Sequence, residues 1–558
     1  KINQKLDFVT KGLSVQAMVN WKNWASSSYN RTIEPYYYGI KGGSYNPSNP
    51  TDYEIERLGT SGTDYLKTSD ISKASDQTFY LDARVNYDRQ FNLHHVTGML
   101  MYMQREYRSS VLPERNQGFS GRFTYDYGQR YLVELNFGYN GTERLAKKER
   151  FEFFPAVSLG WVISNEKFFE PMTKYIDNLK IRGSYGLVGS DETGLSAGAQ
   201  HFLYIDQVSL NNIGFTTGVD MNYTLYGPLV TNYAVVNGGW ERVKKLDIGI
   251  DLELFRQLTI TADYFNEKRY NILLHREAWP ESLGYYTAKP WSNKGKVDNW
   301  GIELSVNWRK EFTKDLYVDF RGNFTYTENK YVNLDEPVYP YVWKTSTGKP
   351  LSRTTGYIAQ GLFSSQEEID NSPTQNLGST VKPGDIKYRD VNGDGKIDGS
   401  DQVMISPYGT TPRIQYGLGM NVTYKKFDFG VFFNGSAKRT IMISGISPFG
   451  QSDYNVMQFI ADDYWSESNP NPNAKYPRLG LTSSQTANNT VASTYWMRNG
   501  NFIRFKTLEL GYKFKYGRVY LNGDNIAVFS PFKLWDPELS WNAYPLQRTF
   551  NIGVQLNF

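Results

Sequence analysis

The last nine residues of the chain alternate strictly between two kinds of side chain. Odd positions carry glycine or a polar amide, and even positions carry the apolar set Phe550, Ile552, Val554, Leu556 and Phe558. Successive side chains of a β-strand point to opposite faces, so this segment predicts a strand with one apolar and one polar face. Such a strand suits a sheet that meets lipid on one side and water on the other.

The odd positions of this segment are Asn551, Gly553, Gln555 and Asn557, so the alternation has no exception. The same period of two recurs at residues 81–87, 246–254, 258–264 and 301–308. Alternation alone is equally good evidence for half-buried strands of a soluble β-sandwich. The lengths of the connections separate the two interpretations.

Short and long connections alternate along the chain. We predict about seventeen strands from the alternation, near residues 1–8, 12–25, 78–89, 93–110, 117–126, 131–143, 153–163, 178–189, 243–254, 258–270, 301–310, 316–330, 413–424, 427–440, 501–513, 516–527 and 547–557. Turns such as 255–257 and 425–426 alternate with long segments such as 331–412 and 441–500. This pattern is typical of an all-β transmembrane up-and-down antiparallel barrel, whereas a Greek-key sandwich has no reason to place its long loops at one end.

The number of strands leads to an expectation about the extent of the chain. If the last strand descends to the periplasm, strict alternation makes the strand near 1–8 descend as well, so the number of strands is odd. A bacterial single-chain barrel closes with an even number. We therefore expect at least one further strand before residue 1, and this chain to be the C-terminal part of a larger protein.

Composition agrees with a membrane barrel and excludes several other classes. No run approaches the roughly 20 apolar residues of a membrane helix, and the mean hydropathy of −0.55 is compatible with strands that meet lipid at every second residue. The 61 basic and 57 acidic residues are too balanced to suggest nucleic acid. Because the chain has no Cys, disulfides and thiolate metal sites are excluded.

Several stretches resemble one known family. They are residues 6–15, 153–169, 178–186, 293–304, 384–390, 518–526 and 544–550. These stretches look like the SusC/RagA family of TonB-dependent outer-membrane transporters of Bacteroidetes. The resemblance implies a 22-stranded barrel over residues 1–558 and beyond, an N-terminal plug, a SusD-like surface lipoprotein as partner and energisation through TonB. No plug-like segment or TonB box precedes the first strand, so we expect both in a segment outside this chain.

The function that the resemblance implies is active import of a bulky nutrient, such as an oligosaccharide or an oligopeptide, across the outer membrane of a Gram-negative cell. Transport of this kind is conformational gating, and we expect no enzymatic activity. Two alternatives stay open at this point. One is a passive porin-like channel, and the other is a soluble all-β carbohydrate-binding protein or glycosidase.

One acidic segment has the spacing of a calcium loop. Residues 390–401, within a longer segment 384–402, place oxygen ligands at the required positions and glycine at the sixth. The predicted ligands are Asp390, Asn392, Asp394, the Lys396 carbonyl, Asp398 and Asp401. No helical pair flanks the loop, which resembles dockerin-type loops. We predict a structural calcium ion in an outer loop; the alternative is a solvated acidic turn.

A possible catalytic motif has no suitable context. Residues 194–198 match the nucleophile-elbow pattern, which needs a strand before it, a helix after it and a His to activate the serine. His94 and His95 are adjacent in a predicted strand, so their side chains point to opposite faces and do not chelate one ion together. A flexible loop is the better interpretation of 194–198.

Aromatic residues cluster in the predicted outer loops. They could stack on sugar rings or bind peptide side chains, although interfacial girdles also collect Tyr and Trp. The candidate substrate-binding residues are Tyr36, Tyr37, Trp279, Tyr286, Trp291, Tyr341, Trp343 and Trp465.

The C-terminal strand carries a further prediction. We expect Val554, Leu556 and Phe558 to form the signal that the outer-membrane assembly machinery recognises.

Overall fold

The computed structural model describes residues 1–109, 113–192, 203–235, 238–283, 289–443, 456–480, 482–540 and 543–557. Seventeen strands share one sheet, and each corresponds to a predicted strand. They are β1 (Ile2–Lys5), β2 (Leu13–Ser28), β7 (Ser72–Phe91), β8 (His94–Arg108), β9 (Glu114–Tyr127), β10 (Tyr131–Thr142), β11 (Phe151–Val162), β12 (Ile176–Ser190), β15 (Glu241–Leu254), β16 (Leu258–His275), β17 (Trp291–Thr313), β18 (Leu316–Asn333), β25 (Ile414–Tyr424), β26 (Phe427–Ala437), β29 (Phe502–Phe514), β30 (Gly517–Phe529) and β31 (Thr549–Leu556).

The chain divides into two compact units, which we describe separately. The first comprises residues 1–87, 99–120 and 140–143, and the second comprises the remainder. In the first unit, β2 pairs antiparallel with β1 and with β7. Two short pairs lie between β2 and β7 in sequence: β3 (Arg31–Thr32) with β6 (Lys67–Thr68), and β4 (Tyr37–Ile40) with β5 (Ile55–Leu58).

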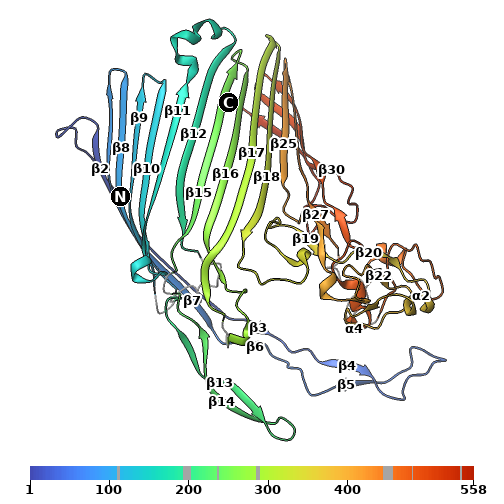
Figure 1. Cartoon of the computed structure of the whole chain (residues 1–558). Helices are drawn as coiled ribbons and strands as arrows, with labels where there is room; N and C mark the ends of the chain where they lie inside the picture. Colours follow the sequence, from blue (N-terminus) through green and yellow to red (C-terminus); the bar gives the residue numbers. More distant parts are fainter. Residues whose placement is uncertain are drawn as a thin grey trace. The chain divides into compact units, whose positions relative to one another are not determined.

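In the second unit, each strand from β11 onward pairs antiparallel with the next strand of the sheet (Figure 1). Tight turns join alternate pairs. Lys425, with a φ of +54°, lies in the turn between β25 and β26, and Phe255 and Arg256 have the same φ between β15 and β16. From β15 onward the other connections are long, so the predicted alternation of short and long connections is confirmed there; β11 and β12 are joined by a longer segment, residues 163–175, instead of a short turn.

The two faces of this sheet differ in chemistry. On one face of β15, Ile248 and Ile250 are 47% and 44% exposed. On the other face, Asp247 and Asp251 lie 3.2 and 3.3 Å from the Arg182 guanidinium. Exposed apolar residues on one face and ion pairs on the other fit a sheet with lipid outside and water inside. We call the two the apolar face and the polar face.

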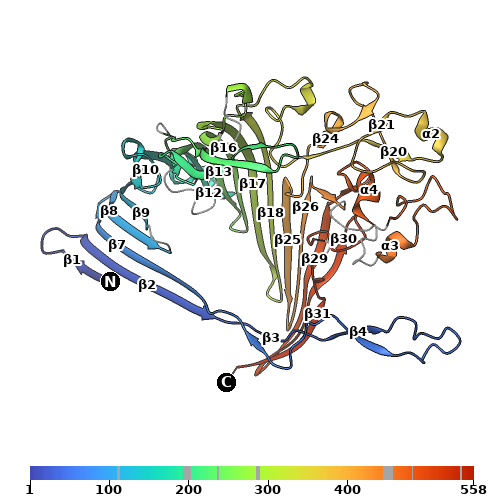
Figure 2. The same cartoon turned by 90° about the horizontal axis from the view of Figure 1, so that it is seen from below.

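Parts of three long connections fold together into a small body, which we call the loop module (Figure 2). It comprises residues 350–412, 440–443, 456–480, 482–499 and 530–539. Its strands and helices are β19 (Thr354–Gly356), β20 (Ala359–Leu362), α2 (Gln366–Asp370), β21 (Thr374–Gln375), β22 (Ile386–Tyr388), β23 (Lys396–Ile397), η6 (Gly399–Asp401), β24 (Val403–Ser406), β27 (Thr440–Met442), α3 (Gln458–Ala461), α4 (Ser483–Thr490) and β28 (Met497–Asn499).

The loop module has its own apolar core. Ile386, Ile397, Ile443 and Ile460 are at most 1% exposed, and they pack in one cluster with Trp496. Burial of so many large apolar side chains stabilises the module as a folded unit. Segments far apart in sequence contribute to this core, and sequence periodicity gave no sign of it.

The remaining connections carry shorter elements. An additional hairpin, β13 (Gln207–Thr217) with β14 (Tyr223–Asn232), lies between β12 and β15. The other elements are η1 (Lys147–Glu149), η2 (Ile163–Asn165), η3 (Lys167–Met172), η4 (Glu281–Leu283) and η5 (Val342–Lys344). Within the described residues, no helix has the length and apolarity needed to cross a membrane.

Candidate functional site

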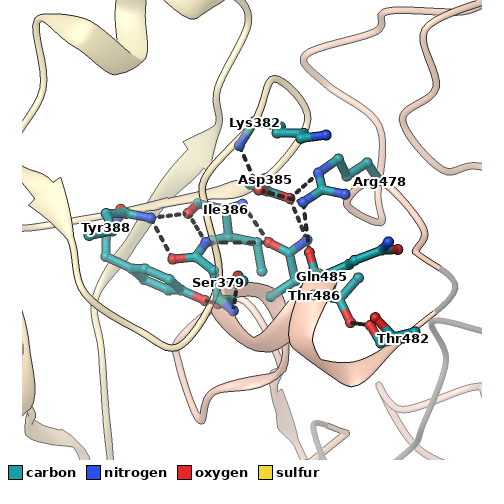
Figure 3. A network of polar contacts seen from close by, with 12 residues as sticks. Ser379, Lys382, Asp385, Ile386, Tyr388, Arg478, Thr482, Gln485 and Thr486 are labelled. Carbon is teal, nitrogen blue, oxygen red and sulfur yellow. Dashed lines mark hydrogen bonds and ion pairs between the residues drawn. The ribbon is translucent and has the colours of Figure 1, made fainter. Parts of the chain in front are cut away.

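The loop module is organised around a buried ion pair (Figure 3). Asp385 is fully buried, and the Arg478 Nε lies 2.7 Å from its Oδ1. The Asn489 amide donates to the same oxygen at 2.7 Å, and the Lys382 N–H donates to Oδ2 at 2.8 Å. Burial raises the pKa of Asp385, while Arg478 and these hydrogen bonds act in the opposite direction. Asp385 directly precedes β22, and Arg478 lies in the segment before α4. The ion pair therefore connects these two segments.

Amide side chains extend this network along β22. Asn489 accepts from the Ile386 N–H at 2.9 Å, and Asn488 donates to the Ile386 carbonyl at 2.9 Å. Gln375 accepts from the Tyr388 N–H at 2.7 Å. Each contact satisfies a backbone group that would otherwise be buried without a partner. Gln375, Asn488 and Asn489 are all buried, so the network supports the interior of the module.

The predicted calcium loop lies within the loop module, and its carboxylates accept backbone N–H groups. Asp390 accepts from Gly393 and Gly395, and Asp394 accepts from the Lys396 N–H at 2.9 Å. The glycines have φ values of +77° and +81°, the left-handed conformation that favours this residue. These hydrogen bonds hold residues 390–396 in a turn.

The last two carboxylates of the loop, those of Asp398 and Asp401, also accept hydrogen bonds from backbone N–H groups. Asp401 is fully buried and accepts from the N–H groups of Val391 and Asp398, at 2.8 and 2.9 Å. Asp398 caps η6 by accepting from the Ser400 N–H, which holds its pKa below the usual range. Among the described residues, no group of three or more His, Asp or Glu side chains is arranged to hold a metal ion. Calcium binding by residues 390–401 therefore stays a prediction from the spacing.

Two candidate aromatic residues contact this loop. Tyr341 and Trp343 stack with ring centroids 4.8 Å apart and an interplanar angle of 10°. The Tyr341 hydroxyl accepts from the Asn392 amide at 3.1 Å, and the Trp343 indole donates to the Ser400 carbonyl at 2.8 Å. The structure thus joins two features that sequence reasoning treated separately. The stacked pair supports the loop, and the indole N–H of Trp343 is already engaged in the hydrogen bond to the Ser400 carbonyl.

The other described candidate aromatics each have local contacts of their own. Trp291, at the start of β17, packs on His275 with ring centroids 3.6 Å apart. The Arg276 guanidinium lies 4.9 Å from the Trp279 ring centroid. Within the first unit, the Tyr36 hydroxyl donates to Asp64 at 2.8 Å, and Tyr37 is 58% exposed on β4. Tyr286 lies outside the described residues.

Trp465 requires a correction. It was predicted to bind substrate at the surface, but it is only 5% exposed and belongs to the core of the loop module. A Cβ atom at Gly384 would lie 2.2 Å from the Trp465 ring, so this glycine is needed for the close approach of the indole. Trp465 is therefore a packing residue, and its ring is not available to a sugar or a peptide.

Of the three predicted assembly residues, two lie on β31. Val554 and Leu556 are 61% and 52% exposed on the apolar face of the strand. Phe558 lies outside the described residues. The assignment of these residues to an assembly signal stays a prediction.

The chain matches the family model described as "TonB dependent receptor-like, beta-barrel" over residues 4–526. It therefore belongs to this family, and the prediction of an all-β up-and-down barrel of the SusC/RagA type is confirmed. The family assignment also places the chain in the outer membrane of a Gram-negative cell. The matched region includes most of the sheet and all of the described calcium-type loop.

Among curated relatives, the chain is 27% identical over 469 residues to the TonB-dependent receptor SusC of Bacteroides thetaiotaomicron, covering 79% of this chain and 43% of SusC. It is 25% identical over 478 residues to the TonB-dependent receptor P3 of Formosa agariphila, covering 78% and 45%. This chain thus matches less than half the length of either relative. Both relatives are receptors by name, which fits the expectation that the chain is not an enzyme.

Solved structures show the same fold. The RagAB peptide importer in its open-open state matches with a TM-score of 0.69 at 18% identity, covering 98% of this chain and 59% of the other. Another structure of the RagAB peptide transporter matches with a TM-score of 0.66 at 19% identity, covering 98% and 60%. At this level of identity the likeness concerns the fold.

Proposed function

We propose that this chain is the barrel portion of an active outer-membrane importer of a bulky nutrient. The observation that carries the proposal is the family match over residues 4–526, on a sheet whose polar face carries ion pairs and whose apolar face is exposed. The folded loop module supports it further. A rigid body built from parts of three long connections gives a transporter a fixed surface beside the strand ends, which a simple pore does not need.

The partners and energy source are part of the same proposal. A SusD-like surface lipoprotein would cooperate with the outer loops, and TonB would act through a segment outside this chain. We propose an oligosaccharide or an oligopeptide as the cargo. The similarity of the chain to SusC and to the RagAB peptide importer supports a cargo of this kind. A passive channel is the alternative, and no contact described above favours it.

We also propose, on the spacing alone, that residues 390–401 bind a structural calcium ion. A carboxylate oxygen that accepts one N–H keeps a further lone pair, so the internal hydrogen bonds of Asp390 and Asp394 are compatible with an ion. The ion would fix the shape of the loop and take no part in transport chemistry.

A gene deletion tests the proposed import. The deletion strain would be grown with oligosaccharides as the carbon source and, separately, with oligopeptides as the nitrogen source. We expect a growth defect on at least one nutrient, rescued by the full-length gene and absent on the corresponding monomers. Equal growth of the deletion and parent strains on every nutrient, with the gene expressed in the parent, would contradict import.

A further inference from the structure

A pocket with a volume of about 610 Å³ opens within the loop module. Two connections that are distant in sequence line it. Residues 474–476, Tyr495 and Arg498 come from the connection between β26 and β29, and residues 531–534 come from the connection between β30 and β31. The volume lies within the range of small-molecule sites. The pocket therefore exists only where the folded module brings these two connections together.

Aromatic rings form much of the pocket wall. The apolar and aromatic lining residues are Ala474, Tyr476, Tyr495, Pro531, Phe532 and Leu534. Tyr476 is 5% exposed and stacks on Trp496 with ring centroids 6.2 Å apart. Phe532 is 4% exposed and meets Trp535 edge to face at 4.6 Å. Because these rings are packed from behind, they offer a preformed apolar surface to a flat ligand.

Three basic side chains line the same pocket, and none of its described lining residues is acidic. The three are Lys475, Arg498 and Lys533. The Lys475 Nζ lies 3.3 Å from the carboxylate of Asp463. Among the residues that the structure describes, neither Arg498 nor Lys533 forms an ion pair. Two positive charges at the pocket are therefore left without a counter-ion, which favours an anionic ligand.

Hydrogen bonds hold the Arg498 guanidinium beside the aromatic rings. Its Nη1 donates to the Tyr495 carbonyl at 2.7 Å and to the Met497 carbonyl at 3.0 Å. A guanidinium has five N–H donors, so these two bonds leave others for a ligand. Burial raises the pKa of the Tyr476 hydroxyl, while Arg498 acts in the opposite direction. The hydroxyl therefore stays protonated at neutral pH and is able to donate to an anion.

The ligand that fits this pocket combines a flat apolar body with one negative group. The rings of Tyr476 and Phe532 suit the body, and the charges of Arg498 and Lys533 suit the negative group. A planar carboxylate matches the fork of a guanidinium. We propose that this pocket is a binding site for an aromatic carboxylate. The inference goes beyond the proposed import, because it concerns binding to the loop module whether or not the ligand is carried across the membrane.

Matched ligands test the site. Binding to the detergent-purified full-length protein would be measured by saturation-transfer NMR with 3-phenylpropanoate and with its uncharged analogue 3-phenylpropanamide. Acetate and methyl phosphate would serve as anions without a ring. We expect 3-phenylpropanoate to bind with a Kd of about 1 mM or tighter. The other three ligands should bind at least about fivefold more weakly, because each lacks either the charge or the ring.

Side-chain replacements locate the binding. Lys533→Met removes the charge of an exposed side chain, and Arg498→Gln removes the guanidinium. Each change should weaken the binding of 3-phenylpropanoate by at least about fivefold, because a charge-assisted contact is lost. Lys382→Met is the matched control, since Lys382 is an exposed lysine of the same module that does not line the pocket.

Hydrogen exchange in β22 would show that the module is folded in each variant, and if Arg498→Gln disturbs it, Lys533→Met decides. The inference is overturned if 3-phenylpropanoate does not bind to the wild-type protein or binds to Lys533→Met as tightly as to wild type. It is also overturned if the amide, acetate or methyl phosphate binds as tightly as 3-phenylpropanoate. Each of these results concerns the purified protein, so the proposed import would still stand on the uptake of its nutrient by cells.

Discussion

Arg478 and Asp385 form a buried ion pair between two connections that are separated by 93 positions in the sequence. Asp385 is fully buried and the Arg478 side chain is 14% exposed. Their contact ties the connection between β18 and β25 to the connection between β26 and β29. The loop module is therefore a single folded body rather than a set of independent loops.

Arg478→Ala should loosen the loop module while leaving the strands intact. Removing one partner of a buried pair leaves an uncompensated charge, which costs about 3–5 kcal/mol. Hydrogen exchange should become faster in β22 and α4 and stay unchanged in β15 and β16. Lys475→Ala is the control: Lys475 pairs with Asp463 in the same module but is 77% exposed, so its loss should cost at most about 1 kcal/mol. If β22 and α4 exchange hydrogen equally slowly in Arg478→Ala and in Lys475→Ala, the proposed role of the Arg478–Asp385 pair is wrong.

Charge on the apolar face of β31 should prevent stable insertion. Ile552 is 80% exposed on this face, and Asn551 points to the opposite face of the same strand. Ile552→Arg should destabilise the folded protein by about 2–4 kcal/mol if it lies near the middle of the membrane, whereas Asn551→Arg at the same depth should be tolerated. Heat-modifiable mobility and abundance in the outer membrane measure the difference. Similar loss in both variants would show that the two faces are wrongly assigned.

Calcium should protect the segment 384–402. Isothermal titration of the purified protein should detect binding, and chelation should increase proteolysis in this segment because metal binding is linked to folding. Asp390→Asn combined with Asp394→Asn should abolish both effects. No heat of binding and identical digestion with calcium and with chelator would favour the solvated acidic turn.

Glu368 should make the loop module sensitive to acid. The Ser364 N–H and hydroxyl donate to its carboxylate at 2.9 and 2.7 Å, which lowers the pKa of Glu368 below its ordinary value of 4.5. A lowered folded-state pKa means that the unfolded chain binds the proton more tightly. The stabilisation is therefore present above the unfolded-state pKa and is lost as the pH falls through the folded-state value.

The melting temperature measured from about pH 6 to about pH 3 should fall more steeply for wild type than for Glu368→Gln, because the amide does not titrate in this range. Glu367→Gln, one position earlier on α2, is the control. Parallel curves for wild type and Glu368→Gln would contradict a contribution from this carboxyl group.

The strands were predictable because alternation is a local property of the sequence. Each of the seventeen predicted strands is present, but β17 begins at Trp291, about ten residues before the predicted start. In this extension Asn293, Lys296 and Asp298 pair with β16 or β18 and are polar or charged. Beyond the membrane a strand needs no apolar face, so the sequence pattern disappears while the backbone pairing continues.

The loop module was not predictable in the same way, because its contacts are distant in sequence. Asn488 and Asn489 belong to no motif, and only the folded chain brings them to Ile386. Trp465 illustrates the opposite error: an aromatic residue in a long connection was interpreted as a binding residue, but the connection folds and buries it. Composition does not distinguish an exposed ring from a core ring when the loop has its own core.

The dependence of uptake on energy tests the proposed active import by the full-length protein most directly. Uptake of the nutrient identified by the deletion experiment would be measured in parent cells, in cells lacking TonB and in cells treated with a protonophore. We expect uptake to fall to the level of the deletion strain in both cases, and the purified protein in a planar bilayer to show no steady conductance. Uptake that persists without TonB, together with a stable open channel, would contradict it and identify a passive pore.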